Sequence, residues 1–266
     1  MKVRILGTAA GGGIPQWNCA CVQCGAARES GEVRSQDSVA VSGNGQDWFL
    51  INASPDIRAQ LLATASLAPG PGRRDTPLRG VLLTTAELDH TIGLLSLREA
   101  SELTVYASPT VHAVLPLLHL VEHYCSVQKK MLEGTTRLPG GLTVRALVVG
   151  RKRPRYAASA TDVTALRITD GRASFVYATC LPAWTAEFDA FVTGADHVLL
   201  DGTFATEDEL TVATGRSGSA AGMGHLPVAA SRPLLARHPG TAFWYSHLNN
   251  TNPLRDGVAH DGQWLG

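Results

Sequence analysis

Three cysteines lie close together, as Cys19, Cys21 and Cys24 in the segment NCACVQC. This spacing is too tight for a disulfide framework in a chain of 266 residues. Three thiolates from one loop can occupy three corners of a tetrahedron around zinc, provided that a fourth ligand comes from elsewhere. The cluster therefore predicts a structural zinc site in a reducing compartment. The alternative interpretation is three reduced thiols that hold no metal.

A second polar cluster follows an apolar segment. Residues 78–85 (LRGVLLTT) are mostly apolar or β-branched, which is typical of a strand buried on both faces. The segment ends at the polar stretch AELDHTIG, which contains Glu87, Asp89 and His90. Polar groups at the end of a buried strand commonly form binding sites, so we expect a functional site at this turn.

The elements that must position these residues alternate between strands and helices. Asp170-Gly171 joins two of the strands in a predicted hairpin. Two stretches rich in proline, glycine or arginine are expected to be surface loops, 66–76 and 151–161, the second at a pocket mouth. Strands with helices on the outside, in two similar halves, predict a four-layer αββα sandwich. The predicted strands are 2–6, 38–42, 48–53, 78–85, 104–108, 162–169, 173–179, 197–203 and 241–247, and the predicted helices are 57–65, 109–124, 184–192 and 226–238.

The bulk composition limits the classes of function. A hydrophobic content of 44% is enough for one substantial core, so we expect a single domain over residues 1–266. The 23 acidic and 23 basic residues balance, which argues against a nucleic-acid partner and in favour of a small-molecule or peptide-derived substrate. No apolar run is long enough for a membrane span, and we expect a cytoplasmic protein. A homodimer is compatible with the sequence.

The polar turn resembles the metal-binding motif of metallo-β-lactamase-fold hydrolases, His-x-His-x-Asp-His followed by x-x-Gly-Leu. Asp89 and His90 match that motif, whereas Thr85 and Glu87 stand at its two leading histidine positions. The resemblance also implies that Tyr177 stands where these enzymes place a bridging aspartate. A threonine hydroxyl is a poor zinc ligand, so these departures argue against a two-metal hydrolytic site.

The same resemblance implies a different, mononuclear site. His247 is at the end of the last predicted strand, where the fold family places its final histidine ligand. Asp89 or Glu87, together with His90 and His247, would form a set of two histidines and one carboxylate, which suits iron(II) or another divalent metal and favours oxidation over hydrolysis. We also count Glu87 among the candidate catalytic residues. A second assignment makes His247 the fourth ligand of the cysteine zinc, as in phosphodiesterases of the carbon–phosphorus lyase pathway.

Asp201 in LLDGTF and His225 in MGHL are candidate catalytic partners. They match an acidic residue and a proton-donating histidine in phosphodiesterases and tRNA-processing nucleases of this fold. A carboxylate that accepts one ring N–H orients an imidazole and raises its basicity. The alternative is a surface histidine beside an unrelated aspartate. Cys125 and Cys180 stand apart from the cluster and are predicted to be small core residues.

Six blocks together resemble the coenzyme PQQ biosynthesis protein B family: LGTAAGGGIPQWNCACVQC, INASPDIRAQL, LDHTIGLLSLREA, DGTF, MGHL and HLNNTNP. The resemblance implies an iron-dependent hydroxylase that acts on the tyrosine ring of a crosslinked Glu-Tyr unit. Residues 121–161 depart from the family pattern, which leaves a paralogue with another amino-acid or peptide-derived substrate open. A metal-dependent hydrolase and a non-catalytic carrier with a structural zinc are the two other hypotheses.

Overall fold

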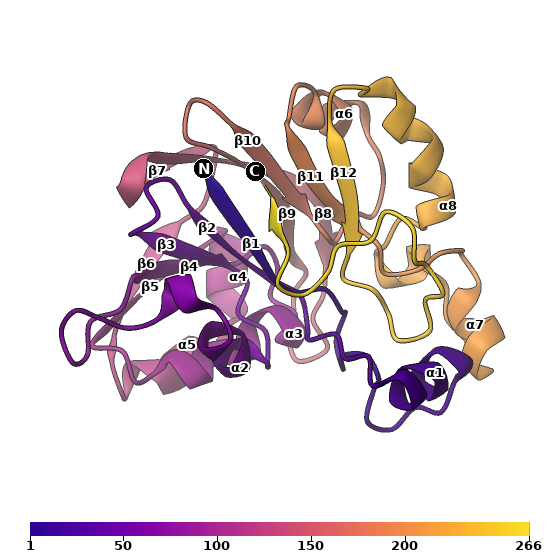
Figure 1. The fold of residues 1–266 in the computed structure, drawn as a ribbon, viewed down its shortest axis with the longest axis horizontal. Coiled ribbons are helices and arrows are strands. Elements are labelled where there is room, and N and C mark those ends of the chain that lie inside the picture. Colours follow the sequence, from indigo (N-terminus) through magenta and orange to yellow (C-terminus); the bar gives the residue numbers. More distant parts are fainter. Residues whose placement is uncertain (266) are drawn as a thin grey trace.

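The computed structural model describes residues 1–265 and consists of two stacked β-sheets with helices on their outer faces (Figure 1). Within these residues the first sheet has the strand order β13-β1-β2-β3-β4-β5-β6. Its strands are β1 (Lys2–Gly7), β2 (Ser38–Ser42), β3 (Trp48–Ile51), β4 (Leu78–Leu82), β5 (Glu102–Ala107), β6 (Ser126–Met131) and β13 (Trp264–Leu265).

The second sheet has the order β12-β11-β10-β9-β8-β7. Its strands are β7 (Thr135–Leu138), β8 (Leu142–Lys152), β9 (Thr161–Thr169), β10 (Ser174–Ala178), β11 (His197–Asp201) and β12 (Ala242–Ser246). Strands β10, β11 and β12 are parallel to one another. Strands β3, β4, β5 and β6 of the first sheet are also parallel. The carboxyl ends of neighbouring parallel strands meet at one edge of each sheet, where sites are commonly built.

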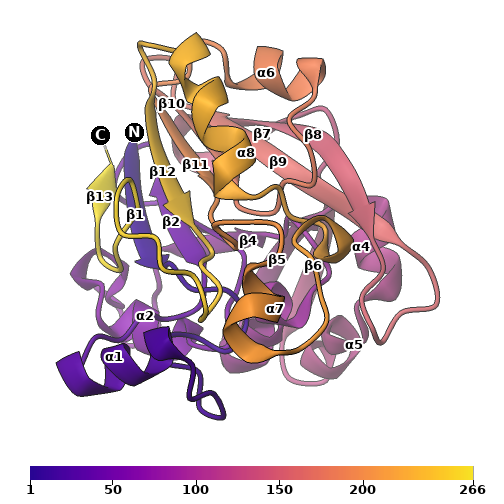
Figure 2. The same cartoon turned by 90° about the vertical axis from the view of Figure 1, so that its right-hand side faces the viewer.

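The helices are short. The α-helices are α1 (Val22–Ser30), α2 (Ile57–Leu62), α3 (Leu88–Thr91), α4 (Pro109–Val114), α5 (Pro116–Glu122), α6 (Ala186–Val192), α7 (Glu209–Thr214) and α8 (Val228–Ser231). Five 3₁₀ segments accompany them in the described chain: η1 (Ala65–Leu67), η2 (Ile92–Leu97), η3 (Pro139–Gly141), η4 (Ala221–Met223) and η5 (Arg232–Arg237). Figures 1 and 2 show α1 and α7 at the end of the sandwich toward which β12 runs.

Three apolar layers hold the sandwich together. The layer between the sheets includes Val41, Phe49 and Phe175, all of them fully buried. A second layer packs the outer face of the first sheet against α2, α4 and α5, and a third packs the second sheet against α6 and α8. Burial of apolar surface in all three layers supplies the main favourable free energy of folding. The predicted four-layer αββα sandwich is confirmed.

Some local predictions were wrong. The expected helix 109–124 is two helices, because Pro116 has no N–H to donate and Leu115 before it is extended (φ −85°, ψ 94°). Strand β6 was missed because its residues are mostly exposed and polar, and helix α1 was hidden in the cysteine segment. The expected loop 151–161 begins inside β8 and ends at the first residue of β9.

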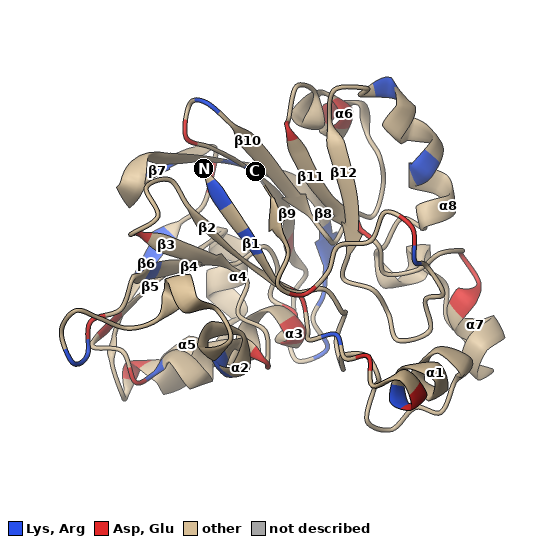
Figure 3. Ribbon diagram, in the orientation of Figure 1, with Lys and Arg blue, Asp and Glu red and all other residues tan. Residues whose placement is uncertain are grey.

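The placement of charged residues along the fold agrees with the balanced composition. Acidic and basic residues are interspersed along the described part of the chain, without a large region of one sign (Figure 3). Within residues 1–265 no helix combines the length and the apolar character needed to cross a bilayer.

Candidate metal centre

The Asp-His turn is held against the first sheet by backbone hydrogen bonds. It forms helix α3, directly after β4. The N–H of Ala53 donates to the carbonyl of His90 at 2.7 Å, and the N–H of Gly93 donates to the carbonyl of Ala53 at 3.0 Å. A Cβ on Gly93 would lie 2.1 Å from the carbonyl oxygen of Ser54, so only glycine permits this approach. The glycine of the motif therefore sets the position of the turn that carries Asp89 and His90.

His90 presents one ring nitrogen to the interior without a partner. The side chain is buried, and its Nδ1 lies 2.9 Å from Thr85 Oγ1, which also accepts the N–H of Glu87. Its Nε2 is buried and has no hydrogen-bond partner among residues 1–265. Burial lowers the pKa of His90 to about 3, which keeps the imidazole neutral. When Nδ1–H donates to Thr85, the lone pair of Nε2 is free to bind a cation.

His247 approaches the same place from the second sheet. It follows β12, with φ 60° in the left-handed region that a non-glycine residue rarely adopts. Its Nε2 lies 3.1 Å from Asp89 Oδ2, and its Nδ1 lies 2.9 Å from Thr203 Oγ1. The rings of His90 and His247 are edge to face, with centroids 5.1 Å apart. The structure therefore brings Asp89, His90 and His247 together, as the sequence predicted.

Asp89 and His247 influence each other's ionisation. Burial disfavours the imidazolium, but the carboxylate of Asp89 and more distant carboxylates outweigh it and raise the pKa of His247. Burial likewise disfavours the carboxylate of Asp89, whereas His90 and His247 hold its pKa well below its usual range. Asp89 is therefore ionised and available as an anionic ligand.

Asp201 and His225 form the predicted dyad. Asp201 Oδ2 lies 2.8 Å from His225 Nδ1, and both side chains are buried. The ring of His225 stacks on that of His247, with centroids 5.6 Å apart. Thr203 Oγ1 lies 3.0 Å from His225 Nδ1 and 2.9 Å from His247 Nδ1, so one hydroxyl links the dyad to the metal-ligand candidate.

A cysteine also belongs to this centre. His90, Cys180 and His247 bring one ligand atom each within 4.8 Å of one another. Asp89 is not one of these three, although it contacts His247. The prediction that Cys180 is a small core residue is therefore wrong, whereas Cys125 does lie in an apolar cluster. The sequence gives only a weak signal for Cys180, which directly follows a predicted strand but is part of no motif.

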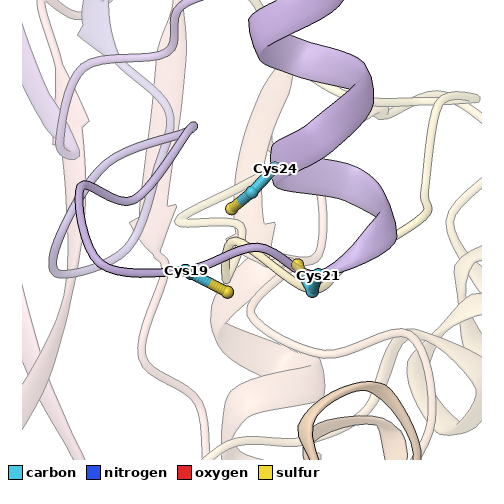
Figure 4. A group of neighbouring side chains, drawn as sticks. All are labelled: Cys19, Cys21 and Cys24. Atoms are coloured by element: carbon cyan, nitrogen blue, oxygen red, sulfur yellow. The ribbon is translucent and has the colours of Figure 1, made fainter.

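The three clustered cysteines form a second group of potential ligands. Cys19 lies in a loop, and Cys21 and Cys24 lie at the start of α1, with the three sulfur atoms turned toward one another (Figure 4). Their Sγ atoms are within 4.8 Å of one another. The side-chain N–H of Asn250 donates to Cys24 Sγ at 3.3 Å, and the backbone carbonyl of Asn250 accepts from Cys21 Sγ at 3.5 Å. The loop after β12 therefore closes this group with Asn250, whereas His247 faces the other centre.

Comparisons with known proteins identify the family and the fold of the chain. Residues 47–248 match the family model described as a Beta-lactamase superfamily domain. A coenzyme PQQ synthesis protein B from Cupriavidus necator is 41% identical, over 95% of this chain and 90% of that protein. The chain belongs to the coenzyme PQQ synthesis protein B family. It thus has the metallo-β-lactamase fold.

Two solved structures are similar to this PqqB-family chain. The Zn²⁺-bound PqqB from Methylobacterium extorquens is 34% identical, with a TM-score of 0.90 and full coverage of both chains. A diphosphatase of the PhnP family is 19% identical, with a TM-score of 0.75 over 100% of this chain and 97% of that chain. The second likeness shows the fold alone.

Tyr177 does not occupy a ligand position in this PqqB-family chain. It is buried, its hydroxyl donates to Asp37 Oδ2, and the amide of Asn52 donates to it at 2.9 Å. Asp37 also accepts from Thr179 at 2.8 Å and from Ser246 at 3.0 Å. A buried carboxylate that the sequence did not single out therefore ties together the residues that precede Cys180 and His247.

Two residues of the basic stretch 151–161 lie beside the centre. Lys152 Nζ is 4.0 Å from Glu87 Oε1, and the hydroxyl of Tyr156 donates to the carbonyl of Ala86 at 2.5 Å. Glu87 Oε1 is buried and has no hydrogen-bond partner. An unpaired carboxylate oxygen and a nearby ammonium group at the Asp-His turn are suited to binding a polar substrate. Sequence reasoning missed Lys152.

Proposed function

We propose that this chain is a mononuclear, iron-dependent hydroxylase of PQQ biosynthesis, working on a tyrosine-like, peptide-derived substrate. Asp89, His90 and His247 would hold the metal. The observation that carries the proposal is the buried Nε2 of His90, which has no hydrogen-bond partner among the described residues. One ring nitrogen of His90 and one of His247 lie within 4.8 Å of each other. A buried nitrogen without a partner costs free energy unless a cation binds it. The family relatives named for PQQ synthesis support the pathway.

The donor set fits a single divalent cation better than a pair. Two imidazoles and one carboxylate leave positions open, and iron(II) in such a set supplies oxidative chemistry with dioxygen. Thr85 stands at one of the two leading histidine positions of the two-metal motif. Tyr177, which was compared with the bridging aspartate of that motif, is hydrogen-bonded to Asp37 and Asn52. Thr85 and Thr203 hold the Nδ1 atoms of His90 and His247, which directs the Nε2 atoms inward.

Other residues of the centre would handle protons and the substrate. The carboxylate of Asp201 contacts Nδ1 of His225 and orients the ring, so that Nε2 of His225 can give or take a proton at the substrate. Glu87 would accept a hydrogen bond from a phenolic or amino group, and Lys152 would pair with a substrate carboxylate. In this proposal Cys19, Cys21 and Cys24 hold a structural zinc, which suits a cytoplasmic protein whose thiols stay reduced.

The direct test is anaerobic reconstitution with iron(II), followed by oxygen-uptake assays with tyrosine-containing peptides. Wild-type protein should bind one iron in the pocket and consume oxygen only with substrate. H90A should lose both the iron and the oxygen uptake, whereas H119A, at an exposed histidine on α5, should lose neither. Iron binding that is unchanged in H90A would contradict the proposal.

A metal-dependent hydrolase is the second candidate, and the Asp201–His225 dyad is the observation that favours it. The dyad lies next to His247 and can donate a proton to a leaving group. The usual mechanism in this fold uses two metal ions. Hydrolysis of bis(p-nitrophenyl) phosphate that depends on His225 and on two pocket ions would establish this function in place of the first. A carrier role would be indicated by pathway output that is unchanged in H90A.

A further inference from the structure

The group of ligand atoms at the metal centre contains a thiol. We propose that Cys180 is a protein ligand of the pocket metal, alongside His90 and His247. The inference deepens the proposed function, because it assumes that a metal binds in this pocket. It adds a sulfur donor to a site otherwise built from nitrogen and oxygen.

The positions of the three ligand atoms carry the first step. His90, Cys180 and His247 have one such atom each within 4.8 Å of the other two. In a tetrahedral site with bonds of about 2.0 to 2.3 Å, ligand atoms lie roughly 3.5 Å apart. Side-chain rotations that move these three ligand atoms by about 1 Å would bring them to that spacing. The buried Nε2 of His90, which has no partner, independently indicates a cation at this place.

The residues on both sides of Cys180 are hydrogen-bonded to the buried side chains of Asp37 and Asp201. The hydroxyl of Thr179 donates to Asp37 at 2.8 Å, and the N–H of Leu181 donates to Asp201 at 2.8 Å. Asp201 is the same carboxylate that orients His225. Ligands held in this way lose little conformational freedom when a metal binds.

The topology explains why these residues meet. Cys180 follows β10, Asp201 ends β11 and His247 follows β12, and these three strands are adjacent and parallel. Their carboxyl ends therefore present side chains at one edge of the second sheet. The Asp-His turn faces that edge from the first sheet. Cys180 is thus placed as a ligand would be.

Packing alone does not account for Cys180. Cys125 is a buried thiol surrounded by leucine and valine side chains, as expected of a core cysteine. Cys180 instead lies outside the apolar clusters of residues 1–265 and shares its surroundings with two imidazoles. A thiol beside two histidines has the surroundings of a metal ligand rather than those of a core cysteine.

A thiolate restricts the class of metal. Sulfur donors favour zinc, cobalt(II) and iron(II) over magnesium, calcium and manganese, which prefer oxygen. Binding replaces the S–H bond of Cys180 with a sulfur–metal bond and releases the proton to solvent, without a change of oxidation state. The site would therefore discriminate against hard cations.

Cobalt(II) is the probe for the test, because thiolate–cobalt bonds absorb strongly in the near ultraviolet. The full chain is titrated anaerobically under reducing conditions, and the bound metal is counted by mass spectrometry. Four proteins are compared: wild type, C180S, C125S and H90A. C125S removes a thiol from the apolar core and is the matched control.

We expect wild type and C125S to bind two cobalt ions with the same charge-transfer absorption. C180S should lose the absorption of one thiolate, and its affinity for the second ion should fall by at least the roughly 10- to 100-fold that loss of an outer-shell partner costs. If C180S has the absorption and affinity of wild type while H90A loses the second ion, Cys180 is not a ligand. The proposed metal site would still stand. A single cobalt ion in wild type that is retained in H90A would overturn both.

A labelling experiment needs no substitution at Cys180. Iodoacetamide modification of each cysteine in wild type is measured by peptide mass spectrometry, with and without cobalt(II). The metal should protect Cys180 by at least about tenfold, and H90A should remove that protection while Cys19, Cys21 and Cys24 stay protected. Equal labelling of Cys180 with and without cobalt would contradict the inference.

Discussion

His247 Nε2 lies 3.1 Å from Asp89 Oδ2, although the two residues are 158 positions apart in the chain. Asp89 lies on α3, after a strand of the first sheet, and His247 follows β12 of the second sheet. The centre is therefore assembled only when the two sheets pack against each other. The positions of the side chains in this centre depend on residues that orient the histidine rings and on residues that hold the ends of the strands in place.

Thr203 orients the histidines, so its hydroxyl should matter for metal binding. T203V keeps the shape of the side chain but removes the oxygen between His225 and His247. We expect the affinity for the pocket metal to fall by about 10- to 100-fold. Competition titration with a chromophoric chelator measures this change. T193V, which removes an exposed hydroxyl at the end of α6, should leave the affinity unchanged.

Gly93 allows α3 to lie against the segment after β3. G93A would place a Cβ 2.1 Å from the Ser54 carbonyl, so the Asp-His turn must shift. We expect a loss of about 1–3 kcal/mol in the free energy of unfolding, together with weaker pocket-metal binding. Urea denaturation and metal titration measure the two effects. G25A on helix α1, where nothing lies near the added Cβ, should be neutral or slightly stabilising, and equal behaviour of the two variants would refute this account.

The sequence was informative about the strands and about the motifs at their ends. Apolar segments predicted β4 and β12, and the resemblance to the metallo-β-lactamase motif assigned Asp89, His90 and His247 to the ends of those strands. The structure brings these three side chains together, and it forms the Asp201–His225 pair. Such predictions succeed because the burial of a strand appears directly in its residue pattern.

Contacts between distant segments were not visible in the sequence. Tyr177 was compared with a bridging aspartate, yet its hydroxyl is bonded to Asp37, a residue 140 positions away. Cys180 was read as a core residue because no neighbouring motif marked it. Lys152 lies beside Glu87 only because β8 runs past the Asp-His turn. Each of these relationships depends on how the two sheets stack, which a local pattern does not encode.

The left-handed backbone of His247 should carry a measurable cost. H247A and H247G both remove the imidazole, but glycine adopts φ 60° without the steric penalty of a Cβ. We expect metal-free H247G to be more stable than H247A by about 1 kcal/mol. Chemical denaturation in the presence of a chelator measures the difference. At Ser246, inside β12, the order should reverse, and the same order at both positions would argue against strain at His247.

Asp37 should make stability depend on pH. Burial raises its pKa above the ordinary value, so the folded protein holds the proton more tightly than the unfolded chain. The contribution of Asp37 is therefore largest below about pH 4 and declines as the pH rises through the raised pKa. D37N lacks this dependence, so the loss of stability relative to wild type should be larger at pH 4.5 than at pH 8. Urea denaturation at both pH values measures it, and a larger loss at pH 8 would be inconsistent with this assignment.

The most direct measurement is an anomalous-difference map from crystals of the full chain, recorded at the edge of the metal that the protein has bound. We predict one peak among Cys19, Cys21 and Cys24, and a second within about 2.0 to 2.3 Å of ring nitrogens of both His90 and His247. Density at the cysteines alone, or a second ion bound away from these two histidines, would contradict the central claim.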